Sequence, residues 1–420
     1  MKRLLLFLFT AAWLPAAAQV SVSSLKVNHM CEPSGVVDAQ PVLSWIVESP
    51  DRNVMQQAYE VRVFRDGRSV WRTGRVESQN SVTVAYEGEP LASGTRYEWQ
   101  VRVWDNRGRV SKWSERSSWL TGMMTPDEWQ AEWILPAEQT DASPMLRKEF
   151  TLSKPVASAV AYITSHGMYE AAINGAKVGN AHYAPGWTSY DKRLQYQTYD
   201  VTGMLQKGAN AFGLTLGRGW YLSLLGWPSG EHQIYAYDKM AAIAQIVITY
   251  RDGTREVIAT DDTWKSSTGE IVHSTIYDGE TIDARLIQHG WNKAGFDDSA
   301  WRGVTVADYP MDNIISSDSE PVVTHEYRTP VEVITTPKGE KVLDFGQNMV
   351  GREIFTYKGR PGQEIVISHA EVLDENGNKI MVPSGDLVLT GEDVESAKVM
   401  WQQSSTGGSS STIVQLTLKE

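Results

Sequence analysis

Apolar and polar residues alternate along the chain from about residue 22 to residue 121. The clearest case is Tyr97–Val103, which has Tyr, Trp, Val and Val at its odd-numbered positions and Glu, Gln and Arg between them. Side chains two apart share one face of a strand, so we expect the odd-numbered set to point into a core. Asp66-Gly67 and Asn106-Arg107-Gly108 are typical of turns between such strands. Residues 22–124 are therefore predicted to form a first β-sandwich.

A second strand-rich region begins after the break at Thr125-Pro126-Asp127. Turns such as Asn174-Gly175 and Asp252-Gly253 separate its short apolar stretches. The stretches expected as strands are residues 159–163, 195–201, 241–250 and 256–260. Helical periodicity is scarce, so a two-sheet jelly roll is predicted over residues 127–315.

The last part of the chain predicts a smaller β-domain followed by a change in character. Residues 325–383 are expected to form a partial third β-domain, with strands at 341–345 and 364–368. Residues 384–420 form a divergent tail that contains a low-complexity Gln/Ser/Gly string, although residues 413–418 could still add one strand. The predicted fold class is all-β, built from tandem β-sandwiches.

Length and charge narrow the choice of function. A chain of 420 residues with 41% hydrophobic and 21% charged residues is long enough for several globular domains. Its 39 basic and 51 acidic side chains give a net charge of −12, which opposes extended contact with a phosphate backbone. Nucleic acid is therefore not expected as a partner. The 16 Trp and 17 Tyr suit both β-sheet packing and sugar binding.

The N-terminus predicts export. Lys2 and Arg3 precede an apolar run and the small residues Ala16-Ala17-Ala18, which is the pattern of a signal peptide at residues 1–18. A secreted, periplasmic or cell-surface location is expected. The single cysteine, Cys31, has no partner within the chain, so core packing and not a disulfide must stabilise the fold. No later stretch is apolar for long enough to predict a membrane span.

Local motifs exclude several kinds of chemistry and leave others open. The eight His never have zinc-site spacing, and neither a G-x-S-x-G nor a P-loop string occurs. Asp261-Asp262 and Asp297-Asp298 could ligate calcium, but their sequence surroundings favour turns and caps. Glycoside hydrolysis needs two carboxylates across a sugar, and no local motif identifies that pair among 51 acids.

Two aromatic segments are the strongest candidates for ligand binding. They are Ala184–Arg193 and Gly217–Tyr221, which place Trp187, Trp220 and Tyr221 among polar and charged residues on expected loops. Sugars are bound by aromatic faces together with polar groups that reach their hydroxyls. For each ring alone, core packing is the slightly better explanation. The cluster as a whole favours a carbohydrate site.

Several segments in fixed order resemble the N-terminal region of bacterial alpha-L-rhamnosidases. These are Trp129…Trp133-Ile134, Leu146–Phe150, Tyr169…Ile173-Asn174-Gly175, Pro185–Arg193, Tyr199–Thr202, Leu216–Tyr221, Tyr277–Glu280…Asp283-Ala284-Arg285, Asp344–Gly351 and His369–Leu373. The resemblance implies a fibronectin III/Ig-like sandwich, then a jelly-roll rhamnosidase N-terminal domain, then a partial concanavalin-like β-domain.

The same resemblance implies a secreted, inverting glycoside hydrolase that removes terminal alpha-L-rhamnose from plant glycosides or pectic polysaccharide. In that family the catalytic acid and base lie in an (α/α)6 helical domain downstream of these β-domains. No residue of this chain is assigned a catalytic role. We expect a chain that is truncated after about Met381, by a frame change or a gene-model error, and that is catalytically silent by itself.

In some relatives the second domain resembles a calcium-assisted rhamnose-binding module. Matching positions place Asn174 on its turn and Asp191 on its loop. The expected carbohydrate-binding set is therefore Asn174, Trp187, Asp191, Trp220 and Tyr221. Calcium stays a candidate without assigned metal ligands, and no other cofactor is expected.

Two other classes of function remain open beside the enzyme family. One is a freestanding carbohydrate-binding protein with a rhamnose-containing glycan as partner, and the other is a scaffold whose aromatic residues only fill cores. Turnover of an aryl rhamnoside separates an enzyme from both. Sugar binding without turnover supports the binding protein and, equally, a truncated rhamnosidase.

Overall fold

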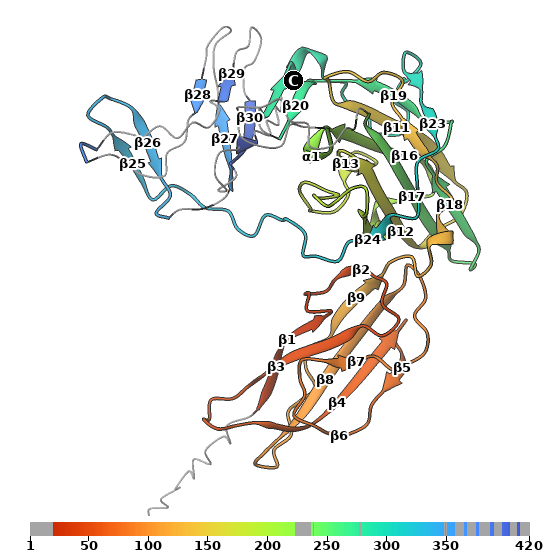
Figure 1. Ribbon diagram of the computed structural model, residues 1–420, viewed down its shortest axis with the longest axis vertical. Helices are drawn as coiled ribbons and strands as arrows, with labels where there is room; N and C mark the ends of the chain where they lie inside the picture. Colours follow the sequence, from red (N-terminus) through yellow and green to blue (C-terminus); the bar gives the residue numbers. More distant parts are fainter. Residues whose placement is uncertain are drawn as a thin grey trace, which may run out of the picture. The chain divides into compact units, whose positions relative to one another are not determined.

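The computed structural model describes residues 20–222, 237, 239–276, 279–347, 349 and 351–357, and the short segments 365–367, 375–377, 387–389, 397–403 and 410–411. The predicted signal peptide and the strand expected at residues 413–418 lie outside the described residues. The chain divides into two compact units, Met1–Met124 and Thr125–Glu420. The described elements are almost all strands, which confirms the all-β fold class (Figure 1).

The first unit is a β-sandwich of two sheets, drawn from red to orange in Figure 1. The smaller sheet has the order β1 (Ser21–Val27), β3 (Val42–Glu48), β7 (Val84–Ala85). The larger sheet has the order β2 (Ser34–Val36), β9 (Ser117–Thr121), β8 (Arg96–Asp105), β4 (Gln56–Arg65), β5 (Arg68–Arg72), and β6 (Val76–Glu77) also pairs with β4.

The core of this unit lies where the alternating pattern predicts it. Tyr97, Trp99, Val101 and Val103 on β8 are at most 2% exposed, as expected from their common strand face. Each such side chain contributes about 1.5–3 kcal/mol when it leaves water. The predicted turn at Asp66-Gly67 joins β4 to β5 with both residues at positive φ, the geometry that favours a two-residue hairpin loop.

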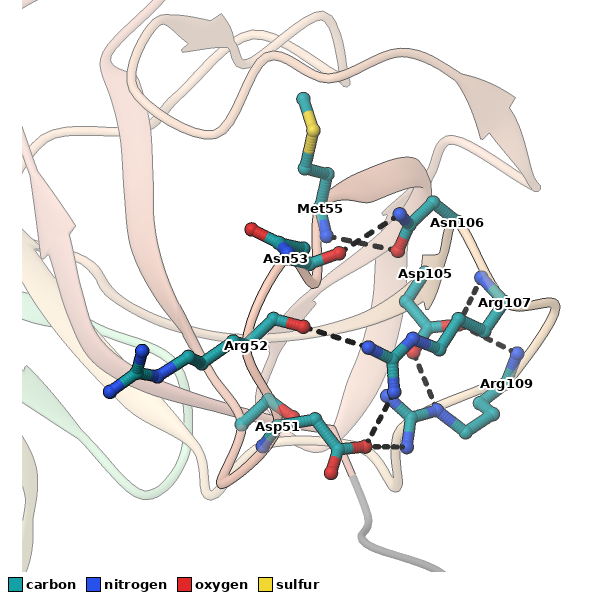
Figure 2. A network of polar contacts seen from close by, with 9 residues as sticks. Asp51, Arg52, Asn53, Met55, Asp105, Asn106, Arg107 and Arg109 are labelled. Carbon is teal, nitrogen blue, oxygen red and sulfur yellow. Dashed lines mark hydrogen bonds and ion pairs between the residues drawn. The ribbon is translucent and has the colours of Figure 1, made fainter.

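A polar network fastens one end of the first sandwich (Figure 2). The side chain of Asp105, which is fully buried, accepts hydrogen bonds from the backbone N–H groups of Arg107 and Arg109 and from Arg109 Nε at 2.7 Å. Arg107 and Arg109 each donate to Asp51 Oδ2 at 2.8 Å. Asn106 accepts from the Met55 N–H and donates to the carbonyl of residue 53. The turn after β8 is thereby tied to the loop before β4.

The second unit contains the two large sheets of the predicted jelly roll. One sheet has the order β23 (Thr305–Ala307), β10 (Trp133–Leu135), β17 (Ala241–Tyr250), β12 (Val156–His166), β15 (Leu194–Asp200), β24 (Ile314–Ser316), and β18 (Arg255–Ala259) also pairs with β17. The other has the order β14 (Ala176–Lys177), β13 (Met168–Ile173), β16 (Gly208–Gly217), β11 (Pro144–Leu152), β19 (Lys265–Thr268), β22 (Arg302–Gly303).

Short elements complete this part of the chain. They are the hairpin β20 (Ile271–Thr275) and β21 (Gly279–Ile282), the 3-10 helices η1 (Pro126–Glu128), η2 (Thr202–Met204) and η3 (Ala284–Leu286), and the helix α1 (Gly219–Leu222). Among the described residues α1 is the only α-helix, and no helix there is long and apolar enough to cross a membrane.

Long apolar strands form the core of the jelly roll. β17 has the same bounds as the predicted strand, and its residues 241–246 are all buried, so both faces of the strand are covered there. Within the sheet, β12 and β18 pair with its two edges. Phe212 and Trp264 meet edge to face at 5.3 Å between ring centroids, and both are fully buried. Buried Arg147 pairs with Asp298 and donates to the carbonyl of Trp291, which fastens the segment after η3 to β11.

The C-terminal part forms small sheets. β25 (Glu332–Thr335) pairs with β26 (Lys341–Asp344), β28 (Ile365–Ile367) with β29 (Leu387–Leu389), and β27 (Gly351–Tyr357) with β30 (Ala397–Gln403), which pairs in turn with β31 (Ser410–Ser411). Three of these strands lie within residues 384–420, the region expected as a divergent tail. Of the described strands there, β29 and β30 pair with the upstream strands β28 and β27.

Candidate carbohydrate-binding site

Two loops carry the aromatic residues that the sequence singles out. Residues 183–193 precede β15, and helix α1 follows β16 directly. Their anchor is β13, because the Tyr169 N–H donates to the carbonyl of Ala184 and Gly219 lies against Met168. Gly219 has φ +54°, and a Cβ there would lie 2.5 Å from Met168 Cγ, so this contact requires glycine.

The most exposed ring of the site is Trp187, at 57%. It stacks on Trp220 with ring planes 12° apart and centroids 6.2 Å apart, and Tyr183 packs against the other indole at 5.7 Å. An offset parallel pair of this kind is a favoured aromatic geometry, so the two indoles hold each other in place. The pair therefore presents a fixed apolar surface to solvent.

Tyr221, the neighbour of Trp220 in sequence, has a different environment. It is 6% exposed and is sandwiched between His166, at 4.7 Å, and Tyr237, at 4.1 Å, with nearly parallel planes. His166 stacks in turn on Trp133 at 4.3 Å. These four rings, which we call the ring column, lead from the β10 core strand to the loops. For Tyr221 itself, core packing is thus the better description.

Asp191 lies at the outer end of the ring column. Its carboxylate accepts a hydrogen bond from the Tyr237 hydroxyl, and the residue is exposed. The loop around it is fixed by the Tyr190 hydroxyl, which donates to the carbonyl of Gly186, and by Asn313, which donates to the carbonyl of Tyr190. Asp191 is therefore an oriented acceptor on the same loop as Trp187.

His166 is a feature of the site that the sequence does not reveal. Burial lowers the pKa of His166 to about 4, so the ring is neutral at pH 7. Its Nδ1 is buried and has no hydrogen-bond partner among the described residues. The sequence signal, a histidine at the end of an apolar strand, is too common to indicate this position.

Asn174 does not join the other predicted residues. It lies beyond the far end of β13 from Gly219, and six strand residues span about 20 Å. Its amide donates to Asn210 Oδ1 and to the carbonyl of Met204, and its oxygen accepts the Ala211 N–H. With φ +53° it forms the predicted Asn-Gly hairpin turn. The hydrogen bonds of the Asn174 side chain therefore stabilise the fold, although the resemblance implies that this side chain binds a carbohydrate.

The donor groups do not fit a calcium site. Asn174 and Asp191 lie apart, and the amide of the former is hydrogen-bonded within the fold. Asp261 pairs with Lys148 and accepts the Thr263 N–H, which is a turn role. Among the residues that the structure describes, no group of three or more His, Cys, Asp or Glu side chains is placed to hold a metal ion.

Comparison with known protein families agrees with this arrangement. Residues 22–125 match the Rha78A-like N-terminal immunoglobulin domain, residues 154–326 the alpha-L-rhamnosidase N-terminal domain, and residues 334–402 the bacterial alpha-L-rhamnosidase concanavalin-like domain. These β-domains belong to the bacterial alpha-L-rhamnosidase family. The family is one of glycoside hydrolases. The third match extends to residue 402, past the boundary predicted at residue 383.

Individual relatives are rhamnosidases of greater length. A curated alpha-L-rhamnosidase of Formosa agariphila is 32% identical over 390 residues, which cover 84% of this chain and 41% of that protein. The crystal structure of the Aspergillus terreus enzyme matches with a TM-score of 0.79 at 36% identity, over 89% of this chain and 45% of the other. The Streptomyces avermitilis enzyme, solved with L-rhamnose, matches with a TM-score of 0.76 at 27% identity, over 90% and 55%. The chain thus spans about 40% of the length of the curated relative.

Proposed function

We propose that the jelly roll of this rhamnosidase-family chain binds rhamnose-containing glycans at the loop surface formed by Trp187, Trp220 and Asp191. The observation that carries the proposal is the parallel indole pair with exposed Trp187, which shares its loop with the oriented carboxylate of Asp191. By binding plant glycosides or pectic polysaccharide, the chain would serve the hydrolysis of terminal alpha-L-rhamnose. Its relatives are named for this reaction.

Each part of the surface has a physical task. The indole face of Trp187 can cover the C–H face of a sugar ring, which removes apolar surface from water. The Asp191 carboxylate accepts hydrogen bonds from sugar hydroxyls, and charge-assisted bonds of that kind are the stronger ones. Tyr237 fixes the carboxylate, and Tyr221 holds Tyr237 by stacking. Tyr221 is therefore a positioning residue in this proposal.

The proposal also states that the chain is exported and that it does not hydrolyse rhamnosides by itself. Inverting hydrolysis needs an acid and a base about 6.5–9.5 Å apart across the sugar, and we assign neither role to a residue of this chain. Export follows from the signal peptide predicted at residues 1–18. An assay with an aryl alpha-L-rhamnoside tests turnover directly. Rhamnose binding without turnover is the expected result for the chain alone.

Calorimetric titration of the full chain with L-rhamnose tests the binding surface. Loss of one aromatic contact is worth about 0.5–1.5 kcal/mol, so Trp187→Ala is expected to weaken binding by about 2- to 10-fold. Tyr327→Ala is the matched control, because Tyr327 is 81% exposed and lies outside both loops. An unchanged isotherm for folded Trp187→Ala, or an equal loss in the control, would contradict the proposal.

A further inference from the structure

The outer face of the larger sheet in the first unit carries alternating arginine and tryptophan side chains. Trp113 lies between Arg62, at 4.2 Å, and Arg102, at 4.8 Å from ring centroid to guanidinium carbon. Trp104 lies between Arg102, at 5.0 Å, and Arg75, at 4.9 Å. Arg62 and Arg102 thus share the Trp113 ring, and Arg102 and Arg75 share the Trp104 ring. Stacking of this kind holds the arginine side chains in fixed positions.

A buried carboxylate beneath these side chains pairs with three arginine side chains. Glu60 is 2% exposed and receives Arg72 Nε at 2.6 Å and Arg102 Nη2 at 2.6 Å, with Arg62 at 3.8 Å. The β4–β8 register places Glu60 directly opposite Arg102. Burial alone would raise the pKa of Glu60, but the hydrogen bonds from Arg102 and Arg72 lower it, so Glu60 is ionised at pH 7. One negative charge therefore faces three positive ones.

The exposed part of this surface is positive. Arg75 pairs with Glu77 and Arg116 with Glu98, so five guanidinium groups meet three carboxylates, of which Glu60 is buried. The Arg72 side chain is 55% exposed, so it reaches solvent beyond its bond to Glu60. This excess contrasts with the net charge of −12 for the whole chain. We call the set Arg62, Arg72, Arg75 and Arg102, with Trp104 and Trp113, the arginine ladder.

We propose that the arginine ladder binds an anionic polysaccharide through its uronic acid carboxylates. The inference rests on the proposed function, since pectic substrates combine rhamnose with galacturonic acid. Guanidinium forks match carboxylates in bidentate geometry, and a row of fixed forks suits carboxylates repeated along a polymer. Because two guanidinium groups lie over the Trp113 ring, recognition is by N–H donors and not by sugar stacking.

Affinity electrophoresis and biolayer interferometry of the full chain against polygalacturonate test this inference. The double variant Arg62→Gln/Arg72→Gln removes the excess positive charge and keeps Arg102 on Glu60. We expect it to weaken binding at least tenfold at low ionic strength, and we expect added salt to weaken wild-type binding. Arg68→Gln/Arg251→Gln is the matched control, because both arginines are exposed and the change in net charge is the same. We expect less than a twofold change in the control.

Two further polymers test whether binding requires the carboxylate charge and the sugar backbone. Fully methyl-esterified polygalacturonate has the same backbone without charge and without rhamnose, and we expect no binding to it. Polyglutamate has carboxylates without sugar, and we expect it to bind at least tenfold more weakly than polygalacturonate. Equal binding to polyglutamate, equal loss in the control variant, or no binding to polygalacturonate would overturn the proposal. Trp187→Ala should leave polygalacturonate binding intact, so failure of the rhamnose site and failure of the ladder are distinguishable.

Discussion

The strongest stability prediction concerns Asp105, the centre of the network in Figure 2. Its buried carboxylate accepts two backbone N–H groups and Arg109 Nε. Asp105→Ala removes all three bonds, and Arg109 keeps its pairing with Asp51. Hydrogen bonds to charged groups contribute about 1.5–3 kcal/mol each and are not additive, so we expect a loss of about 2–4 kcal/mol in the first unit. Asp105→Asn keeps an oxygen acceptor and should cost about 1–2 kcal/mol.

Amide hydrogen exchange of the full chain, read by mass spectrometry, measures this loss locally. A cost of about 2–4 kcal/mol accelerates exchange in β4 and β8 by about 30- to 1,000-fold, since every 1.4 kcal/mol is tenfold. The exchange rates of amides in the strands of the second unit should not change. Asp252→Asn is the control, because Asp252 also caps a turn and pairs with a lysine but is 51% exposed. The reasoning is refuted if Asp105→Ala accelerates exchange no more than this control does.

The pH dependence of the same network has a definite sign. Burial alone would raise the pKa of Asp105, but hydrogen bonds from Arg109 and Arg107 lower it below its usual value. The carboxylate therefore stabilises the fold at pH values above its unfolded pKa of about 3.9, and this contribution is lost as pH falls through the folded pKa. The stability of Asp105→Asn should change less than that of the wild type below about pH 4. Urea unfolding of both proteins between pH 2 and pH 6 measures the difference.

The other predictions concern the candidate carbohydrate site. Gly219→Ala forces a Cβ against Met168 at positive φ, so we expect a loss of about 1–3 kcal/mol and weaker rhamnose binding, measured by urea unfolding and calorimetry. His166→Phe replaces a buried nitrogen that lacks a partner among the described residues, and should be neutral or stabilising at pH 7. Because burial lowers the folded pKa of His166, the wild type should lose more stability than His166→Phe as pH falls from about 6.5 to about 4.

Local patterns in the sequence predict most strands, because alternation and turn residues act over short distances. β17 and the Asn174-Gly175 turn are clear cases. The ring column could not be predicted, since His166, Tyr221 and Tyr237 come from separate segments that only the strand pairing brings together. The same limit applies to Glu60 and Arg102, which become neighbours only in the β4–β8 register.

The adjacent residues Trp220 and Tyr221 show why composition alone cannot separate a binding site from a core. Both are large amphipathic rings on one short helix, yet Tyr221 is buried in the ring column while Trp220 supports exposed Trp187. The core ring gives the loop its shape, and the outer rings provide the surface. A buried aromatic residue beside a sugar site is therefore not evidence against binding, because a rigid aromatic surface needs an ordered support beneath it.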